Sequence, residues 1–293
     1  MQTVGIIGLG LIGGSIGLAL KRQSANAGNP AYRVIGYDYN PTRRKQAEEL
    51  QAVDHICHDL IEVAQQAHIV IIATPVLAVR ETLAALAPYV RAETIITDTA
   101  STKFAVLRWA RELLPPDTQF IGGHPMAGGT GSLEEARPDL FHQATYCLVP
   151  NMQPDEASHV SETALQDLIA ALGAAPLLID AQTHDHCVAA ISHLPFLTSV
   201  ALVETVASSP EVELMRQLAS SGFRDASRLA AGDPAMYQGI ALTNREAITF
   251  WLDSYIEQLQ TIRQMLQAAP NAGDEQFLTL FQRAQQHRKE LLG

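Results

Sequence analysis

The hydrophobic positions of the chain follow two different patterns, and the change between them falls near residue 180. Before it, short apolar runs typical of strands alternate with stretches of helical periodicity. After it the short runs stop, and helical periodicity continues almost to the end of the chain. We expect strands at 4–7, 32–37, 67–74, 94–97, 120–121, 146–150 and 177–179, and later helices at 183–207, 211–221, 234–268 and 274–292.

Strands that alternate with helices at this spacing predict right-handed βαβ units and a doubly wound sheet. The last two strands are expected to be antiparallel or at an edge of the sheet. We therefore predict an α/β protein whose first domain, 1–180, holds the sheet and whose second domain, 181–293, is all-helical.

A glycine-rich turn, Gly8-x-Gly10-x-x-Gly13, follows the first strand and leads into a helical pattern. Gly8 permits the sharp bend, Gly10 lets a pyrophosphate approach the backbone, and Gly13 lets the helix pack closely on the strand. Free N–H groups at the start of the helix, around Leu11 and Ile12, then hold the anion. This pattern predicts the dinucleotide site of a Rossmann-type domain.

Asp38 ends the second strand, 25 residues beyond Gly13. A carboxylate there accepts hydrogen bonds from the adenosine ribose hydroxyls and repels a 2′-phosphate, which favours NAD. Arg43 and Arg44 lie just beyond and keep NADP open, unless they are solvated charges on the next helix. Two more expected cofactor contacts, at the end of the third main strand, are Thr74 and Pro75.

The composition narrows the class of partner. The chain has 293 residues, 47% apolar and 17% charged, which is enough to fill sizeable cores in two domains. Its formal charge of −11 argues against nucleic acid or an anionic membrane as a partner, and an anionic substrate needs locally placed cations. Three scattered cysteines indicate neither a disulfide framework nor a metal site, and they suit a reducing cytosol. The apolar stretch 188–207 is expected to be a core helix rather than a membrane span.

The segments that leave the later strands carry candidate chemistry. Ligands of doubly wound sheets lie outside the carboxyl ends of the strands, so Asp98, Ser101 and His124 are expected to face the cofactor cleft. His124 is the candidate base, because an unperturbed imidazole pKa of about 6.5 suits proton transfer at neutral pH. The alternative is a loop histidine that caps backbone groups. Lys103 adds positive potential there or is a solvated lysine at a helix start.

Two features of the helical region suggest contacts with a substrate. Pro195 lies inside the helix predicted over 183–207, where an interior proline costs roughly 3 kcal/mol and bends the chain. The bend aims Ser192 and His193 into a site, or His193 is a core residue beside an incidental kink. In the predicted turn 220–228, Arg224 and Arg228 form either a carboxylate pocket or solvated charges of a loop.

These segments together resemble the prephenate/arogenate dehydrogenase family of tyrosine biosynthesis, and most of all its cyanobacterial arogenate enzymes. The matching segments, in the family's order, are Gly8–Gly13, Thr97–Lys103, Gly122–Gly128, His184-Asp185, Ser192–Pro195 and Ser221–Arg228. The resemblance implies a cytoplasmic homodimer formed through the helical domain. It also implies oxidative decarboxylation of arogenate to tyrosine, or of prephenate to 4-hydroxyphenylpyruvate, with hydride transfer to NAD or NADP.

The same resemblance implies roles for the candidate residues. His124 is the base, and Ser101 orients both the substrate hydroxyl and His124. Arg228 holds a substrate carboxylate, within one subunit or across the dimer interface. The other residues expected to bind substrate are Ser192, His193, Lys103 and Arg224. We expect no further domain before Met1 or after Gly293.

One departure from the family pattern bears on the substrate. Some prephenate-specific members have a histidine directly after Pro195, associated with the pyruvyl side chain and with tyrosine inhibition, where this chain has Phe196. Its absence favours arogenate, although arogenate enzymes tend to use NADP and Asp38 favours NAD. Two alternatives are a β-hydroxyacid dehydrogenase, which usually employs a helix lysine that 188–207 lacks, and an NAD-binding redox sensor, which needs no base.

Overall fold

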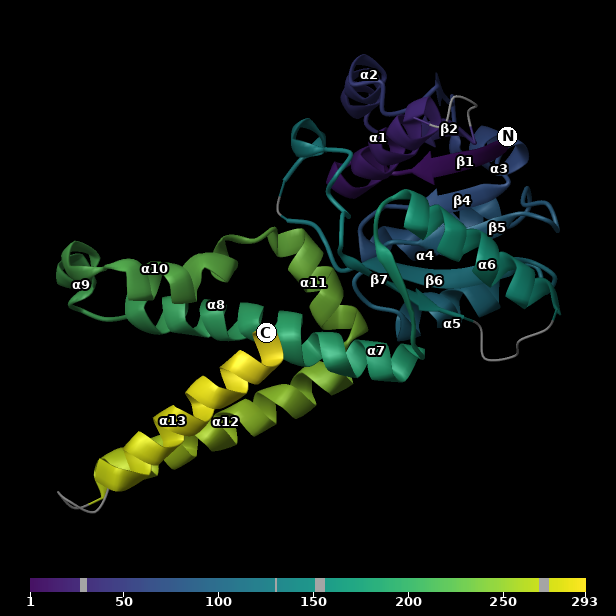
Figure 1. Cartoon of the computed structure of the whole chain (residues 1–293). Helices are drawn as coiled ribbons and strands as arrows, with labels where there is room; N and C mark the ends of the chain where they lie inside the picture. Colours follow the sequence, from purple (N-terminus) through teal and green to yellow (C-terminus); the bar gives the residue numbers. More distant parts are fainter. Residues whose placement is uncertain (27–30, 130, 151–155, 269–273) are drawn as a thin grey trace. The chain divides into compact units, whose positions relative to one another are not determined.

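The computed structural model describes residues 1–26, 31–129, 131–150, 156–268 and 274–293 (Figure 1). The chain forms two compact units, Met1–Arg245 and Glu246–Gly293. The first holds the sheet and most of the helices, and the second is a pair of helices. The change of element type near residue 180 lies inside the first unit, so the division into 1–180 and 181–293 stays a prediction about domains.

In the part of the chain that the structure describes, eight strands form one sheet of order β3-β2-β1-β4-β5-β6-β7-β8. Neighbouring strands pair in parallel except β7, which runs antiparallel to β6. The strands are β1 (Gln2–Ile7), β2 (Tyr32–Tyr37), β3 (His55–Ile56), β4 (Ile69–Ile72), β5 (Ile95–Asp98), β6 (Gln119–Pro125), β7 (Thr145–Val149) and β8 (Ala175–Leu178). The two-residue β3 was not predicted, because two residues show no periodicity.

Helices cover both faces of this sheet, and each face has its own core. In β4 the side chains of Ile69 and Ile71 enter one core while Val70 and Ile72 enter the other, as the alternation of a strand requires. One core contains α1 (Leu11–Asn26), α2 (Pro41–Glu49), η1 (Leu133–Glu135) and α6 (Glu156–Ala171); the other contains α3 (Leu60–Gln66), α4 (Val76–Leu86) and α5 (Phe104–Leu113). The predicted doubly wound α/β sheet domain is confirmed.

The rest of the chain is helical, as predicted, with two differences in detail. Residues 221–227 form a helix rather than the expected turn, and Asn244, at φ −132° and ψ 38°, divides the helix expected over 234–268. The elements are α7 (Ala181–Val188), η2 (Ala189–His193), α8 (Leu194–Ala207), α9 (Val212–Leu218), α10 (Ser221–Ser227), η3 (Arg228–Ala231), α11 (Pro234–Thr243), α12 (Arg245–Gln267) and α13 (Asp274–Leu292).

A π-helical turn accommodates the interior proline. The N–H of Leu194 donates to the carbonyl of Ala189, five residues back, and this wider turn is η2. Pro195 has no N–H to donate, so the helical hydrogen-bond pattern is already interrupted where the turn widens. The predicted bend is therefore a π-turn that ends at the buried His193.

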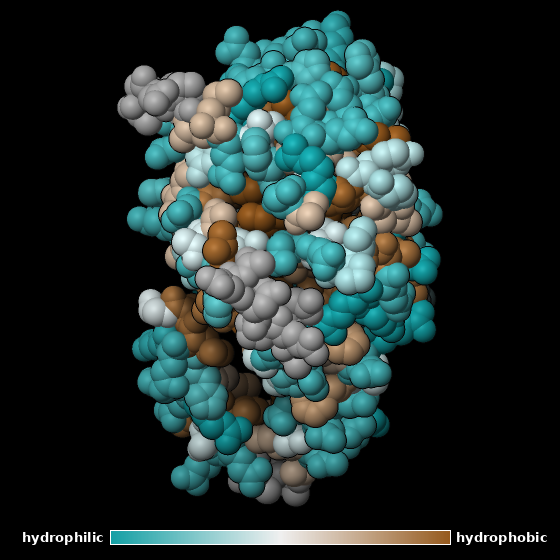
Figure 2. Space-filling model, turned by 90° about the vertical axis from the view of Figure 1, so that its right-hand side faces the viewer, coloured by the Kyte–Doolittle hydropathy of each residue, from teal (hydrophilic) through white to brown (hydrophobic). Residues whose placement is uncertain are grey.

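The apolar helical run Ala181–Ala207 is not a core helix of the single chain. It is long and apolar enough to cross a membrane by length and composition, yet only 22% of its most apolar window is buried. Other large apolar side chains are exposed on the later helices, among them Leu218 on α9, Phe250 on α12 and Phe281 on α13. By contrast, Figure 2 shows a face on which most side chains are hydrophilic and apolar ones form small patches.

Helices α12 and α13 form an antiparallel pair in the second unit (Figure 1). Side chains of both helices, including Ile262 and Leu280, line one hollow between them. The pair thus buries part of its apolar surface within itself.

Gly17 provides a test of this packing. A Cβ at Gly17, inside α1, would overlap the backbone oxygen of Ala52, which cannot move aside as a side chain does. Alanine normally stabilises a helix interior by about 0.5–1 kcal/mol relative to glycine. We expect Gly17→Ala instead to lower the free energy of unfolding by about 1–3 kcal/mol.

The measurement is urea unfolding followed by circular dichroism. Gly10→Ala is the control, because nothing lies within 4 Å of a Cβ at Gly10 and its stability is expected to match the wild type. A midpoint for Gly17→Ala equal to that of the control would contradict the packing described.

Candidate functional site

A cavity of about 600 Å³ lies along the carboxyl ends of the strands, with α11 forming part of its wall. Eight of the nine residues predicted to bind the cofactor line it: Gly8, Gly10, Leu11, Ile12, Asp38, Thr74, Pro75 and Ser101. Gly13 does not, since it packs against the carbonyl of Gly8. The structure thus brings the separate sequence segments together around one space.

The glycine turn has the geometry that its sequence predicts. Gly8 has φ +98°, in the region that favours glycine. A Cβ at Gly13 would overlap the oxygen of Gly8, whereas the space above Gly10 is open. The turn therefore leaves a cradle at Gly10, at the amino end of α1, where an anionic group can approach the backbone.

Asp38 is buried and held in place by backbone donors. Its Oδ2 accepts a hydrogen bond of 2.8 Å from Leu9 N, and its Oδ1 accepts one of 2.8 Å from Asn40 N. Arg43 Nη1 lies 3.9 Å from Oδ2, and Arg43 lines the cavity rather than projecting only into solvent. Arg44 turns away to the carbonyl of Asp38 and over the ring of Tyr37. A carboxylate and a guanidinium therefore meet at this end of the cavity.

Thr74 shows a further sign of a ligand. Its Oγ1 is buried and has no hydrogen-bond partner among the residues that the structure describes. A buried hydroxyl is normally satisfied, so this one is available to a bound molecule. With the glycine cradle and Asp38, these groups fit a dinucleotide.

The loop that carries Ser101 is fixed on both sides of that residue. Asp98, at the end of β5, accepts hydrogen bonds from Ala100 N at 2.9 Å and Gly123 N at 3.1 Å, and pairs with Lys103. The Lys103 side chain is completely buried and also donates to the carbonyl of Gly123, so the interpretation as a solvated lysine is wrong. Burial lowers the pKa of Lys103, and Asp98 opposes that shift.

His124 lies on β6 itself, paired with Cys147 of β7, because the strand extends through Pro125. It is therefore not a histidine of a loop. Its Nδ1 lies 2.9 Å from Nε2 of His184, which belongs to α7. Burial, assisted by the positive potential of His184, Lys103 and His193, holds the pKa of His124 well below its ordinary value.

His184 is in turn bonded to Asp185, also on α7. His184 Nδ1 lies 2.8 Å from Asp185 Oδ1, and both residues are buried. The same carboxylate accepts hydrogen bonds from Lys103 N at 2.7 Å and Phe104 N at 2.9 Å, at the start of α5. In the sequence, His184 and Asp185 match the family pattern, but no role was predicted for them.

His193 joins this group through Asn244. Asn244 Nδ2 lies 3.3 Å from His193 Nδ1 and donates to the carbonyl of Asp185 at 2.8 Å. Burial lowers the pKa of His193 to about 4, and its Nε2 has no partner among the described residues. No pattern in the sequence marks Asn244, because its contact is with His193, 51 residues earlier in the chain.

Arg228 and Arg224 are exposed and form no ion pair with any residue that the structure describes. Arg228 lowers the pKa of Tyr237, which burial raises, so the two lie close enough to interact electrostatically. The Tyr237 ring stacks on Phe196, with centroids 3.4 Å apart. Arg228 is thus near Phe196, next to the Ser192–Pro195 segment, although it does not line the cavity.

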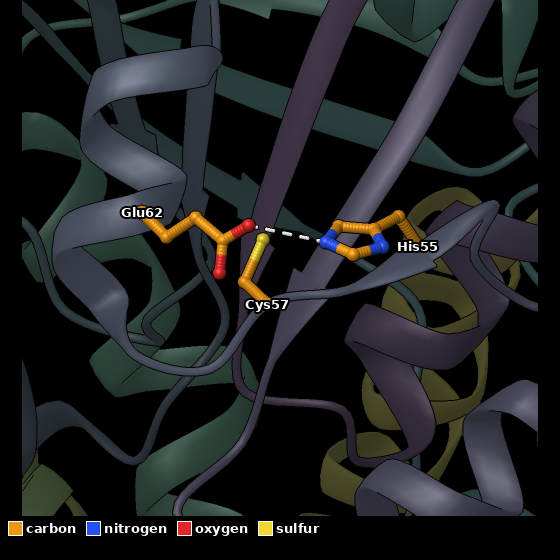
Figure 3. Close-up of side chains that lie close together, drawn as sticks. All are labelled: His55, Cys57 and Glu62. Carbon is orange, nitrogen blue, oxygen red and sulfur yellow. Dashed lines mark hydrogen bonds and ion pairs between the residues drawn. The ribbon is translucent and has the colours of Figure 1, made fainter.

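A separate cluster of potential metal ligands consists of His55, Cys57 and Glu62 (Figure 3). Glu62 Oε1 lies 3.1 Å from His55 Nε2 and accepts from Gln66 Nε2 at 2.9 Å, while Oε2 accepts from His58 N. Burial raises the pKa of Cys57 to about 12, which keeps the thiol protonated. Hydrogen bonds within the fold thus hold the Glu62 carboxylate of this cluster.

Comparisons with known proteins match both parts of the chain. Residues 16–174 match the nucleotide-binding domain of prephenate dehydrogenase, and residues 180–283 match its dimerization domain. Prephenate dehydrogenase of Bacillus subtilis is 35% identical over 265 residues, which is 89% of this chain and 69% of that protein. Cyclohexadienyl dehydrogenase of Zymomonas mobilis is 32% identical over 89% of this chain and 87% of that protein.

Solved structures agree. Arogenate dehydrogenase of Synechocystis superposes with a TM-score of 0.82 at 32% identity, covering 99% of this chain and 100% of that chain. Prephenate dehydrogenase of A. aeolicus, in complex with hydroxyphenyl propionate and NAD+, gives a TM-score of 0.88 at 26% identity, covering 99% and 98%. The resemblance found from the motifs is confirmed, and this chain belongs to the prephenate dehydrogenase family of oxidoreductases.

Proposed function

We propose that the protein oxidatively decarboxylates arogenate to tyrosine with NAD, and that prephenate is its second candidate substrate. This proposal rests mainly on the position and protonation state of His124. This residue is neutral at neutral pH because burial lowers its pKa, and it lies beside the loop whose Ser101 lines the cofactor cavity. His124 does not line the cavity itself, but a neutral imidazole beside the end that Ser101 lines is suited to take a proton from a substrate hydroxyl.

The reaction needs a proton acceptor at the substrate oxygen and cations at the carboxylates. When bound, the nicotinamide ring accepts the hydride from the carbinol carbon. His124 takes the hydroxyl proton, with Ser101 orienting that hydroxyl. The bond between the ring and its carboxylate then breaks, CO2 leaves, the electron pair of that bond enters the ring, and the proton returns to the oxygen as the ring becomes aromatic. Formation of the aromatic product supplies the driving force. The protein therefore mainly has to position the substrate and neutralise the charge of its carboxylates.

The cations nearest to this chemistry come from different parts of the chain. Lys103 is buried beneath the site, so we propose that it contributes positive potential and holds Asp98 rather than gripping a carboxylate directly. Arg228 is free to bind a substrate carboxylate, and Arg224 lies one helical turn earlier. Local cations are needed because the formal charge of the chain is −11.

Phe196 supports arogenate as the preferred substrate. It stacks on Tyr237 and so presents an aromatic surface where a histidine would offer a polar partner to a pyruvyl side chain. The Synechocystis relative is an arogenate dehydrogenase, whereas the B. subtilis relative is a prephenate dehydrogenase. Ser192 and His193, on the same turn, are proposed to line the pocket for the substrate ring.

Asp38 supports NAD as the preferred cofactor. Two backbone donors hold its carboxylate at the adenosine end of the cavity, where it would repel a 2′-phosphate. Arg43 also lines this end and is the residue that would pair with such a phosphate. The preference for NAD thus depends on Asp38 outweighing Arg43.

We also propose that residues 1–180 bind the nucleotide and that 181–293 bind substrate and form a cytoplasmic homodimer. The match to a dimerization domain supports this, as do the exposed apolar residues of the helical region. One hollow there is lined by Val203 and Val206 of α8, Met215 and Leu218 of α9, and Phe223 of α10. A second copy, rather than lipid, is proposed to cover these residues.

The decisive test of specificity is an assay of arogenate and prephenate, each with NAD and NADP, that follows the reduced cofactor. We expect the highest kcat/KM for arogenate with NAD. Asp38→Ser is expected to shift the NAD/NADP preference at least about tenfold toward NADP, because the repelling charge is gone. Adding Arg43→Ala to Asp38→Ser should reverse most of that gain, and an unchanged ratio in both variants would exclude Asp38 as the discriminating group.

His124→Asn tests the base. The amide retains polarity but cannot take a proton, so kcat should fall about 10²–10⁴-fold while the Kd values for cofactor and substrate stay within about threefold. In the wild type, the lowered pKa keeps His124 unprotonated below pH 6.5. Activity should therefore persist as pH falls past 6.5 and be lost only at more acidic pH. Near-normal turnover of the variant with both ligands bound would refute this assignment.

Arg228→Ala tests the carboxylate contact. Loss of a charge-assisted hydrogen bond should raise the substrate KM by about 10–100-fold and leave the cofactor Kd unchanged. The control is Arg108→Ala, which removes an exposed arginine of α5 that pairs with the neighbouring Glu112. Equal KM values for the two variants would remove Arg228 from the pocket.

A further inference from the structure

We propose that His184 and Asp185 are positioning residues that fix the tautomer of His124, so that its Nδ1 carries the proton and its Nε2 is free to accept one. The consequence for turnover rests on the proposed function. The tautomer itself does not, because it is a property of the three side chains that lie in a row between α7 and β6.

The first group in the row is the Asp185 carboxylate, which can only accept hydrogen bonds. Asp185 accepts from the backbone N–H groups of Lys103 and Phe104, which are donors under all conditions. Its Oδ1 also lies 2.8 Å from His184 Nδ1. A carboxylate held by two amides has only lone pairs to offer, so the shared proton sits on His184 Nδ1.

The position of the proton on His184 then decides which ring donates in the contact between His184 and His124. A neutral imidazole with a proton on Nδ1 has a lone pair on Nε2. His184 Nε2 lies 2.9 Å from His124 Nδ1, so His124 must supply the proton of this contact. His184 is buried and His124 is half-buried, and the lowered pKa of His124 keeps its ring neutral. With its proton on Nδ1, His124 presents a bare Nε2 on the other side of the ring.

The charges around His124 favour the same arrangement. Lys103 also faces this ring, and its positive charge acts against a second proton on the ring in the resting state. When His124 Nε2 takes the proton of the substrate hydroxyl, the ring becomes positively charged. The hydrogen bond to His184, backed by the Asp185 carboxylate, then stabilises that transient charge until the proton returns to the product oxygen.

Two His184 variants separate this role from simple packing. In His184→Gln, the side-chain oxygen can still accept the proton of His124 Nδ1. In His184→Leu that acceptor is absent, and a neutral ring populates both tautomers. We expect kcat to fall about 10²–10⁴-fold in His184→Leu and at most about tenfold in His184→Gln, with KM values within about threefold of the wild type in both.

The direct readout is the ¹⁵N NMR spectrum of protein labelled at its histidine rings, in which the signals of His124 are identified by their absence from His124→Asn. The wild type and His184→Gln should show a protonated Nδ1 and a bare Nε2, and His184→Leu a mixture. His159→Leu makes the same replacement at an exposed position of α6 and should leave both the His124 signals and turnover unchanged.

A wild-type ring protonated at Nε2 would overturn the proposal, as would an unchanged His124 tautomer in His184→Leu. If His184→Leu does not fold, the spectrum of the wild type decides alone. If the wild type turns over neither arogenate nor prephenate, the proposed function fails, while the same spectrum still decides the positioning role of His184 and Asp185.

Discussion

The Asp185 carboxylate is the interaction on which the site most depends. It extends from α7 to the first backbone N–H groups of α5, which have no partner within that helix. The same oxygen that binds Lys103 N also binds His184, and His184 binds His124 of β6. One side chain therefore joins the start of a sheet-domain helix, the first helix of the following region and the candidate base. Any shift of α7 would move the acceptor that orients His124.

The buried ion pair of Lys103 and Asp98 also helps to fix the site. Removing one partner of a buried ion pair typically costs about 3–5 kcal/mol, because the other charge is left unpaired. Here each partner has further bonds: Asp98 to Ala100 N and Gly123 N, and Lys103 to the carbonyl of Gly123. The loop between Asp98 and Lys103 carries Ser101, the residue proposed to orient the substrate hydroxyl. The position of Ser101 therefore depends on an ion pair that does not itself line the cavity.

Different physical interactions define the two ends of the site. At the end proposed to bind adenosine, the glycine turn and Asp38 rely on backbone geometry: a positive φ at Gly8, open space at Gly10, and a carboxylate fixed by Leu9 N. At the other end, buried ionisable side chains set each other's protonation, and burial lowers the pKa values of both His124 and His193. The first end is thus proposed to bind the cofactor through its shape, and the second to prepare a proton acceptor through electrostatics.

Local patterns predicted most of the fold and the cofactor end. The glycine turn, the strand that ends at Asp38 and the strand that precedes Thr74 each lie within one short segment, so periodicity and residue type suffice. The histidine row could not be predicted in this way, because His124 meets His184 across 60 residues and Asp185 meets Lys103 across 82. Burial of Lys103 and the π-turn before Pro195 likewise depend on packing against distant elements. The sequence therefore specified which chemical groups were available, and the tertiary structure decided which of them touch, which are removed from water and, through that, which can carry a proton.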